Sequence, residues 1–599
     1  MATPVTESNS GPSVGKMFAA AVILAAAGGV GTYVVLAPSQ SERILATLPP
    51  LPSFERKPAA LEQRLHAAHA AARESGSIED LIEYVTLLHA NGFAERAAQG
   101  WLLLGSVDPS NAQWPYYLAH LRRDEGDIGE TARLLGQTVE IAPTYSPAWL
   151  QLGDLALKSA KWDLAQSHYE ERLHLVAKDP YARIGLARIE LQKGDRSAAR
   201  EALNEIVKDH PQFSSAHNLL ARMYREDGDK DLANRHRWEG YRSGRFITAE
   251  DPWLRELEAA CLTPSMLFVY GMVEFQTGRG DLGRSAYERA VEYEPENPGN
   301  HELLGDLYRK LKEPELARAS LRRSLELSAA SGTSPSLLAL IHLGAIEREI
   351  GNFASSRAII AQGIESHPAS PELQVELGLS LDALGENEKA GDAFRKAITM
   401  SPNDTAANFH LGEWWLRRDE TEQAIPHFEQ SLALQPTFSP SLRYLLQYTL
   451  GTNQLDKAQE YADTLLGAYY GDSEVRQLVA ICYLRLGREQ LTRNETATAI
   501  DRFRTARKLD ADDVDIAFEL GTLLLAEGSF REALPPLETL LKKRPTDARA
   551  HFFLAQAQLM DGRPRAAKSL LEKGLRFAEQ SGNRSTAANI REMLQAISR

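Results

Sequence analysis

The strongest constraint on the fold is a period of 34 residues that runs through most of the chain. Residues 371–404 set the pattern, and four of their positions recur with the same residue type 34 positions later: Gly378 and Gly412, Ala390 and Ala424, Phe394 and Phe428, Pro402 and Pro436. A fixed period of this length is typical of a stacked array of two-helix units. The sequence therefore predicts an all-α chain.

Each recurring position has a physical role in a helix pair. Leu377 and Leu381 share one face of a predicted first helix because they are spaced i, i+4. Gly378 has no side chain, so a second helix can approach closely, and Phe394 fills the space beyond that approach. Pro402 cannot continue a helix and ends the second one. Neither helix buries its apolar stripe alone, so each unit needs neighbours.

These positions resemble the tetratricopeptide repeat. The segment 411–436 carries the full pattern of that family, with Leu411, Gly412, Trp415, Ala424, Phe428 and Pro436. Two other segments carry most of it: Leu304, Gly305, Tyr308, Ala317 and Leu321 in one, and Trp149, Leu152, Gly153, Ala165 and Tyr169 in the other. The resemblance covers roughly five-sixths of the chain and implies a right-handed superhelical solenoid. The register gives about fourteen helix pairs, and the uncharged residues 17–36 predict one transmembrane helix before them.

Composition and repeat register predict the following order of segments: a disordered tail at 1–16, a transmembrane helix at 17–36, a Pro-rich extended linker at 37–58, a capping helix at 59–77, the first part of the repeat array at 78–247, an insertion at 248–263, the second part of the array at 264–581 and a C-terminal capping helix at 582–599. Further spacers between repeats are expected at 331–336 and 467–473.

The insertion interrupts the register and has its own helical pattern. Trp253, Leu254, Leu257 and Cys261 would line one helical face, with Asp251 as the N-cap. The insertion either pads a joint or plugs a groove of the array, or it is an element specific to one partner.

Residues 17–36 are 20 uncharged residues, which is long enough to cross a bilayer as one helix. The alternative is a cleaved signal peptide, but the apolar run is longer than a typical signal core.

A short tail before a single anchor resembles bacterial proteins that export the domain behind it. We expect a single-pass protein of the bacterial inner membrane, with the array on the periplasmic side. The flanking basic residues favour the opposite orientation, although long domains translocate largely regardless of charge.

Small residues spaced by four within that segment, Ala21, Ala25 and Gly29, would let two copies pack closely as a homodimer. The alternative is an alanine-rich span without a partner.

Charge and motifs argue against several classes of function. The net charge of −14 disfavours a nucleic-acid partner, because such proteins present a basic face. Residues 278–283 fit GxGxxG, but predicted helices flank them, whereas a dinucleotide site needs a strand before the motif. His66 and His69 could share a metal, but we favour an exposed pair on a capping helix. We predict no cofactor, no metal and no enzymatic activity.

Binding is the better prospect, and the register places candidate residues on the first helices. Arg188, Asn218, Arg222 and Arg225 could hold carboxylates of an extended peptide. Phe268, Met272 and Phe275 offer an adaptable apolar surface. The alternative is that these side chains belong to solvated or inter-repeat faces.

The first functional hypothesis is a membrane-tethered, non-catalytic scaffold that binds a peptide segment or assembles a complex. The second is an accessory subunit of envelope biogenesis, such as polysaccharide or appendage export. The second rests on the resemblance alone.

Overall fold

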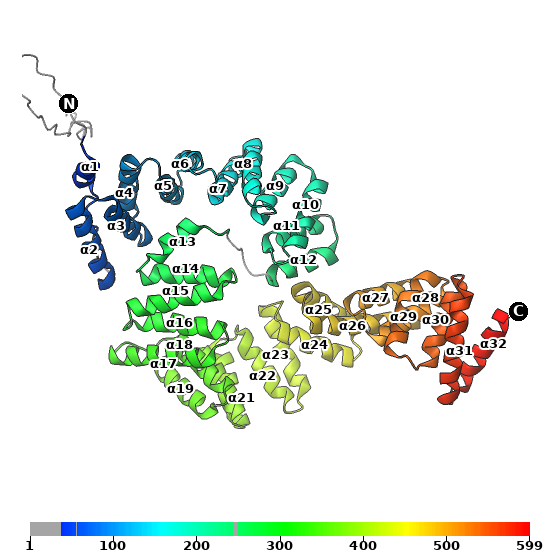
Figure 1. Ribbon diagram of the computed structural model, residues 1–599. Helices are drawn as coiled ribbons and strands as arrows, with labels where there is room; N and C mark the ends of the chain where they lie inside the picture. Colours follow the sequence, from blue (N-terminus) through cyan, green and yellow to red (C-terminus); the bar gives the residue numbers. More distant parts are fainter. Residues whose placement is uncertain (1–37, 56, 243–248, 599) are drawn as a thin grey trace, which may run out of the picture. The chain divides into compact units, whose positions relative to one another are not determined.

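Figure 1 shows a computed structural model of the chain, which describes residues 38–55, 57–242 and 249–598. Over those ranges the secondary structure consists of 32 α-helices, without a β-strand. The helices form two compact units, one drawn from residues 1–211 and 246–304 and the other from residues 212–245 and 305–599. The prediction of an all-α chain is confirmed.

The first unit contains α1 (Gln40–Thr47), α2 (Ala59–Ser75), α3 (Ile78–Ala90), α4 (Ala94–Val107), α5 (Gln113–Asp124), α6 (Ile128–Ile141), α7 (Ser146–Lys158), α8 (Trp162–Leu175), α9 (Pro180–Lys193), α10 (Arg196–Asp209), α13 (Pro252–Ala259), α14 (Pro264–Gln276) and α15 (Gly280–Tyr293). The boundary between the units falls within α16 (Pro298–Lys310).

The second unit contains α11 (Ser214–Glu226), α12 (Lys230–Arg242), α17 (Pro314–Ala330), α18 (Leu337–Glu349), α19 (Phe353–Ser366), α20 (Pro371–Ala383), α21 (Asn387–Met400), α22 (Thr405–Leu416), α23 (Thr421–Leu434), α24 (Ser439–Gly451), α25 (Leu455–Tyr469), α26 (Ser473–Thr492), α27 (Thr496–Leu509), α28 (Val514–Ala526), α29 (Phe530–Lys543), α30 (Ala548–Met560), α31 (Pro564–Gln580) and α32 (Arg584–Ser598).

Within each unit the helices pack in the order of the chain. A first helix contacts the second helix that follows it, and that second helix contacts the next first helix, as in α20, α21 and α22. Successive first helices also contact one another, for example α7 with α9 and α28 with α30. This nearest-neighbour packing is the arrangement expected of a repeat array.

The turn inside each pair depends on a residue with positive φ. Gly385 joins α20 to α21 with φ of +77°, a conformation that glycine adopts without a Cβ clash. The amide of Glu386 donates to the carbonyl of Leu381 at 2.9 Å, which satisfies one of the last carbonyls of α20. Asn453 takes the same conformation between α24 and α25.

The core of a pair lies where the two helices cross. Ala390 and Phe394 of α21 are fully buried. A Cβ on Gly378 of α20 would lie 2.4 Å from Cε1 of Phe394, so only glycine allows this approach. The repeated glycine, alanine and aromatic residue thus form one packing unit.

The structure differs from the extended linker expected at residues 37–58. Residues Gln40–Thr47 form α1, whose N-cap Ser39 and residue Glu42 make a reciprocal capping box. Ile44 of this helix is fully buried, and Leu51 and Phe54 pack against the core of the first unit. Apolar side chains in the Pro-rich stretch therefore bind it to the repeats.

The localisation predicted from residues 17–36 is corrected. That segment lies outside the described residues. Among the residues that the structure does describe, no helix is both long enough and apolar enough to cross a membrane. The longest of them, the 20-residue α26, carries Glu474, Arg476, Arg485, Arg488 and Glu489, and charges are costly inside a bilayer. The single-pass inner-membrane placement is withdrawn, together with the bilayer contact and the homodimer that depended on it.

Candidate functional site

The predicted basic residues lie on two first helices. Arg188 is exposed on α9 of the first unit, and Asn218, Arg222 and Arg225 are exposed on α11 of the second unit. Arg222 approaches Glu226 of its own helix at 3.7 Å. Arg188 thus belongs to a surface of the first unit, and Asn218, Arg222 and Arg225 belong to a surface of the second unit.

The predicted apolar residues all lie on α14, but they do not share one environment. Phe268 is buried, and its ring packs edge-on against Tyr287 with centroids 4.8 Å apart. Phe275 is half-buried, whereas Met272 is 44% exposed. Two exposed neighbours that the sequence reasoning missed, Val269 and Val273, extend the apolar surface around Met272.

The most elaborate site of the first unit is formed where residues 251–263 contact α5 and the ends of α3 and α7. Asp251 caps α13 by accepting from the amide of Leu254 at 3.2 Å, and Pro252 occupies the first turn. Four residues from the start of the array hold this segment: Asn91, Tyr116, Tyr117 and Tyr145. We call these four residues the α13 clamp.

Two tyrosines of the α13 clamp donate hydrogen bonds to the carboxylate of Asp251. Tyr145 donates its hydroxyl to Oδ1 at 2.6 Å, and Tyr116 donates to Oδ2. Burial, followed by the charge of Asp251, raises the pKa of Tyr116 and of Tyr145 above the usual value. Both hydroxyls therefore remain protonated and act as donors to the carboxylate.

The same tyrosines also contact Trp253. The indole of Trp253 stacks on the ring of Tyr145, with centroids 3.4 Å apart and planes 9° from parallel. The Trp253 amide donates to the Tyr145 hydroxyl at 3.3 Å, and the Tyr117 hydroxyl donates to the Trp253 carbonyl at 3.0 Å. One aromatic side chain and its main-chain groups are thus recognised together.

Asn91 holds the other end of the segment through its amide group. Its Oδ1 accepts from the Leu262 amide at 2.7 Å and from the Thr263 hydroxyl at 2.9 Å, while its Nδ2 donates to the Ala260 carbonyl at 3.2 Å. Asn91 is fully buried, so these partners satisfy polar atoms that water does not reach.

The α13 clamp was not predicted. A helix in the segment that it holds was predicted, but α13 ends at Ala259, so Cys261 lies outside the helical face expected for it. Asp251 as cap and Leu257 and Cys261 as buried residues follow from the sequence pattern of the insertion. The clamp residues are 106–172 positions away in sequence from the groups they hold. The adjacent Tyr116 and Tyr117 on a first helix were the available signal, because paired aromatics on such a face favour binding over solvation.

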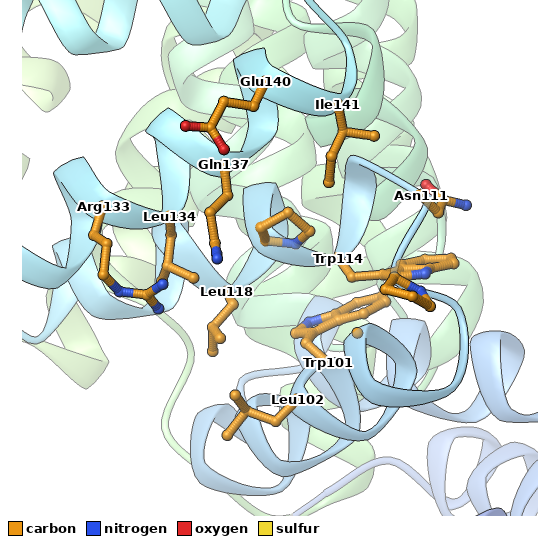
Figure 2. A pocket seen from close by; sticks show the side chains of 13 residues that line it. Trp101, Leu102, Asn111, Trp114, Leu118, Arg133, Leu134, Gln137, Glu140 and Ile141 are labelled. Atoms are coloured by element: carbon orange, nitrogen blue, oxygen red, sulfur yellow. The ribbon is translucent and has the colours of Figure 1, made fainter.

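The first unit also has a pocket among α4, α5 and α6 (Figure 2). It has a volume of about 320 Å³. Trp101 and Trp114 stack along one wall with planes 14° apart, and Gln137 and Glu140 line another (Figure 2). The indole nitrogens already donate to His89 and to Asp108, so the tryptophans offer the pocket only their apolar surfaces.

Among the described residues no group of His, Cys, Asp and Glu is arranged to hold a metal ion. Residues 510–515 include four aspartates, of which Asp513 caps α28 by accepting from the Ile516 amide at 2.8 Å. What the sites above can do is bind: they combine hydrogen bonds to main-chain groups, two tyrosine hydroxyls that donate to a carboxylate, and an aromatic platform.

The chain matches two family models described as tetratricopeptide repeat, one at residues 156–223 and 524–587 and the other at 269–334, 343–405 and 484–534. It is 22% identical over 454 residues to the Superkiller complex protein 3 of Mus musculus, covering 74% of this chain and 28% of that one. It is 23% identical over 548 residues to the cellulose synthase operon protein C of Xanthomonas axonopodis pv. citri, covering 86% of this chain and 34% of that one. The chain thus spans about a third of these relatives or less.

Among solved structures, MamA of Desulfovibrio magneticus is 19% identical and covers 29% of this chain and 96% of its own, with a TM-score of 0.26. A TM-score this low supports neither fold nor function here. The repeat motifs, the helix pairs and the family models agree with one another. The chain belongs to the tetratricopeptide repeat family and is a scaffold for protein–protein interaction.

Proposed function

We propose that this scaffold is non-catalytic and holds a peptide segment of a partner protein across its first helices. The α13 clamp carries the proposal, because there α5 and the ends of α3 and α7 already hold a chain segment by contacts that a peptide ligand would also make. Extended ligands gain affinity from main-chain hydrogen bonds and specificity from a few side-chain contacts. Asn91 and Tyr117 supply the former, and Tyr116 and Tyr145 supply the latter.

Elsewhere the first helices present exposed side chains suited to the same task. Arg188 in the first unit, and Arg222 and Arg225 in the second, would pair with carboxylates of the partner. Asn218 would bond to its main chain, and Met272 would cover an apolar side chain. Phe268 is left out of this surface because it is buried against Tyr287.

Site-specific photocrosslinking in cells of the source organism tests the proposal. A photoreactive amino acid replaces Arg188, Met272 or Arg222 in turn, and Arg565, exposed on the second helix α31, is the matched control. We expect a crosslinked protein at one or more of the first-helix positions and none at Arg565. Equal crosslinking at Arg565, or none at all three first-helix positions, would refute binding along the first helices.

A second candidate function is an accessory role in envelope biogenesis or the export of polysaccharide or appendages. It is supported by the similarity to the cellulose synthase operon protein, which covers 86% of this chain. Deleting the gene and measuring secreted polysaccharide and surface appendages tests this role. Unchanged amounts of both would count against it without affecting the peptide-binding proposal.

A further inference from the structure

We infer that residues 251–263 occupy, within the chain, a docking site for a partner segment that carries a carboxylate two residues before an aromatic ring. This inference rests on the proposed peptide-binding function and names the class of segment that the α13 clamp selects. This sequence pattern is that of the segment now bound by the α13 clamp, in which Asp251 precedes Trp253 by two residues.

The segment is held as a ligand rather than as a repeat. Its helix, α13, has 8 residues, whereas α14 and α15 of the following pair have 13 and 14. It contacts α3, which is more than 160 residues earlier in the chain. A repeat helix packs on its sequence neighbours instead.

The contacts divide into two kinds with different consequences for specificity. Tyr117 bonds to the main-chain carbonyl of Trp253, so it would accept a segment of almost any sequence. Asn91 bonds to main-chain groups of Ala260 and Leu262 and fixes the far end of the segment. Tyr116 and Tyr145 bond to one carboxylate, and Tyr145 stacks on one aromatic ring. An asparagine in place of the carboxylate would give weaker bonds, because hydrogen bonds to an ionised acceptor are about twice as strong.

The apolar anchoring of the segment is moderate. Leu257 is buried, but Trp253 and Leu254 are only half-buried, and Arg255 and Glu256 face solvent. The far end is fixed more firmly, since Arg289 donates to the carbonyls of Ala259 and Cys261 at 2.9 and 2.6 Å. The part that a partner would replace is therefore residues 251–258, while Arg289 keeps its bonds to Ala259 and Cys261 and Asn91 keeps its bonds to residues 260–263.

A tethered segment competes strongly with a free one. Its effective concentration is on the order of millimolar, so a partner with the same contacts would bind the intact chain weakly. Weakening the tethered segment should therefore reveal the site. Asp251→Asn combined with Trp253→Ala in the full chain removes the carboxylate and the stacked ring but leaves all four clamp residues.

The probe is a synthetic, fluorescently labelled peptide of residues 249–263 with Cys261→Ser, and its binding is followed by polarisation. We expect the double variant to bind it at least about tenfold more tightly than the wild-type chain, because the competitor is weakened. The single variant Arg255→Ala is the matched control, since Arg255 is exposed and pairs with Glu250 of its own segment at 3.4 Å, and it should bind as the wild type does. A peptide carrying both substitutions itself should lose most of its affinity for the double variant.

The specificity contacts are tested separately. Adding Tyr145→Phe to the double variant should reduce the preference for the aspartate peptide over its Asp251→Asn counterpart. An unchanged preference would show that the carboxylate is not read by Tyr145.

If the double variant folds, with unchanged circular dichroism, and binds the peptide no better than the wild type, the inference is wrong. If it does not fold, hydrogen exchange on the wild-type chain decides. The amides of α13 should then exchange at least tenfold faster than those of α3 and faster still with added peptide. Equal protection of the α13 and α3 amides would show that the segment is a permanent part of the core, and the inference would be wrong.

Photocrosslinking at Arg188, Met272 and Arg222 tests the proposed peptide-binding function independently of these outcomes.

Discussion

The ring of Tyr169 lies directly against Gly185, so that a Cβ on this glycine would stand 2.3 Å from Cζ of the tyrosine. Gly185 belongs to α9, the first helix of the next pair. Gly153 of α7 approaches the same ring, with an ideal Cβ 2.6 Å from Cε1. Tyr169 therefore fits between two successive first helices because both lack a side chain at the contact.

Replacing Gly185 by alanine should destabilise the first unit by about 1–3 kcal/mol, because overpacking forces a buried ring and two helices apart. The measurement is the urea midpoint of unfolding, followed by circular dichroism. The control is Gly136→Ala in α6, where a Cβ would meet nothing within 4 Å. That change should be neutral or stabilising by up to about 1 kcal/mol, since alanine favours a helix over glycine. Equal effects of the two substitutions would contradict the packing account.

How far the sequence predicts such contacts depends on the distance along the chain. The 34-residue period correctly identifies Gly378 and Phe394 as packing partners, because both lie within one repeat. It also identifies Gly153, but not Gly185, since the register assigns the close approach in that repeat to Leu186 and Ala187. Ala187 is the residue 34 positions after Gly153, and Gly185 lies two residues before it, where the large ring of Tyr169 reaches across to the next pair.

The candidate site was harder to predict, for a related reason. A repeat register describes contacts between neighbours, whereas Asp251 meets Tyr116 across 135 residues. The same register placed Phe268 on a binding face, yet Tyr287 of the adjacent helix covers it. Local patterns did predict the local features: Asp251 caps its helix, as a residue directly before Pro252 should.

A buried ion pair joins two repeats of the first unit and should be costly to break. Arg172 of α8 donates to Asp179 at 2.8 and 3.2 Å, and both side chains are less than 10% exposed. Asp179 also caps α9 through the Ala182 amide. Arg172→Met would leave a buried carboxylate without its charge partner, so we expect a loss of about 3–5 kcal/mol in the free energy of unfolding.

The matched control for this pair is Arg133→Met. Arg133 pairs with Glu130 at 2.6 Å, but the two side chains are 52% and 33% exposed. Exposed pairs contribute about 0–1 kcal/mol, so denaturant unfolding of this variant should be close to the wild type. If Arg172→Met were as mild as Arg133→Met, the buried pair would not stabilise the unit.

His89 gives the stability of the first unit a defined pH dependence. Burial lowers the pKa of His89 to about 4, and its Nδ1 accepts from the Trp101 indole at 3.0 Å, which requires the neutral ring. In the unfolded chain the imidazole titrates near 6.5. Between pH 6.5 and 4 the unfolded chain therefore binds a proton that the folded chain does not, so stability falls as pH falls through this window.

The variant His89→Gln keeps an acceptor for Trp101 but does not titrate. Relative to it, the wild-type chain should lose about 2–3 kcal/mol of unfolding free energy between pH 7 and pH 4. His174→Gln, at a side chain 74% exposed, serves as control and should follow the wild-type curve. Parallel pH curves for the wild type and His89→Gln would refute the assignment.

The second unit contains a contact that joins α12 to the turn between α25 and α26. The indole of Trp238 packs on Gly471 so closely that an ideal Cβ there would lie 1.3 Å from Nε1. Gly471→Ala must therefore displace the indole, and overpacking of this kind costs about 1–3 kcal/mol. Since proteolysis follows the population of the open form, trypsin cleavage after Arg237 and Arg242 should rise by roughly tenfold. Gly467→Ala is the control, because a Cβ at that position of α25 meets nothing within 4 Å. Cleavage rates read by mass spectrometry should separate the two variants, and equal rates would show that Trp238 does not hold α12 in place.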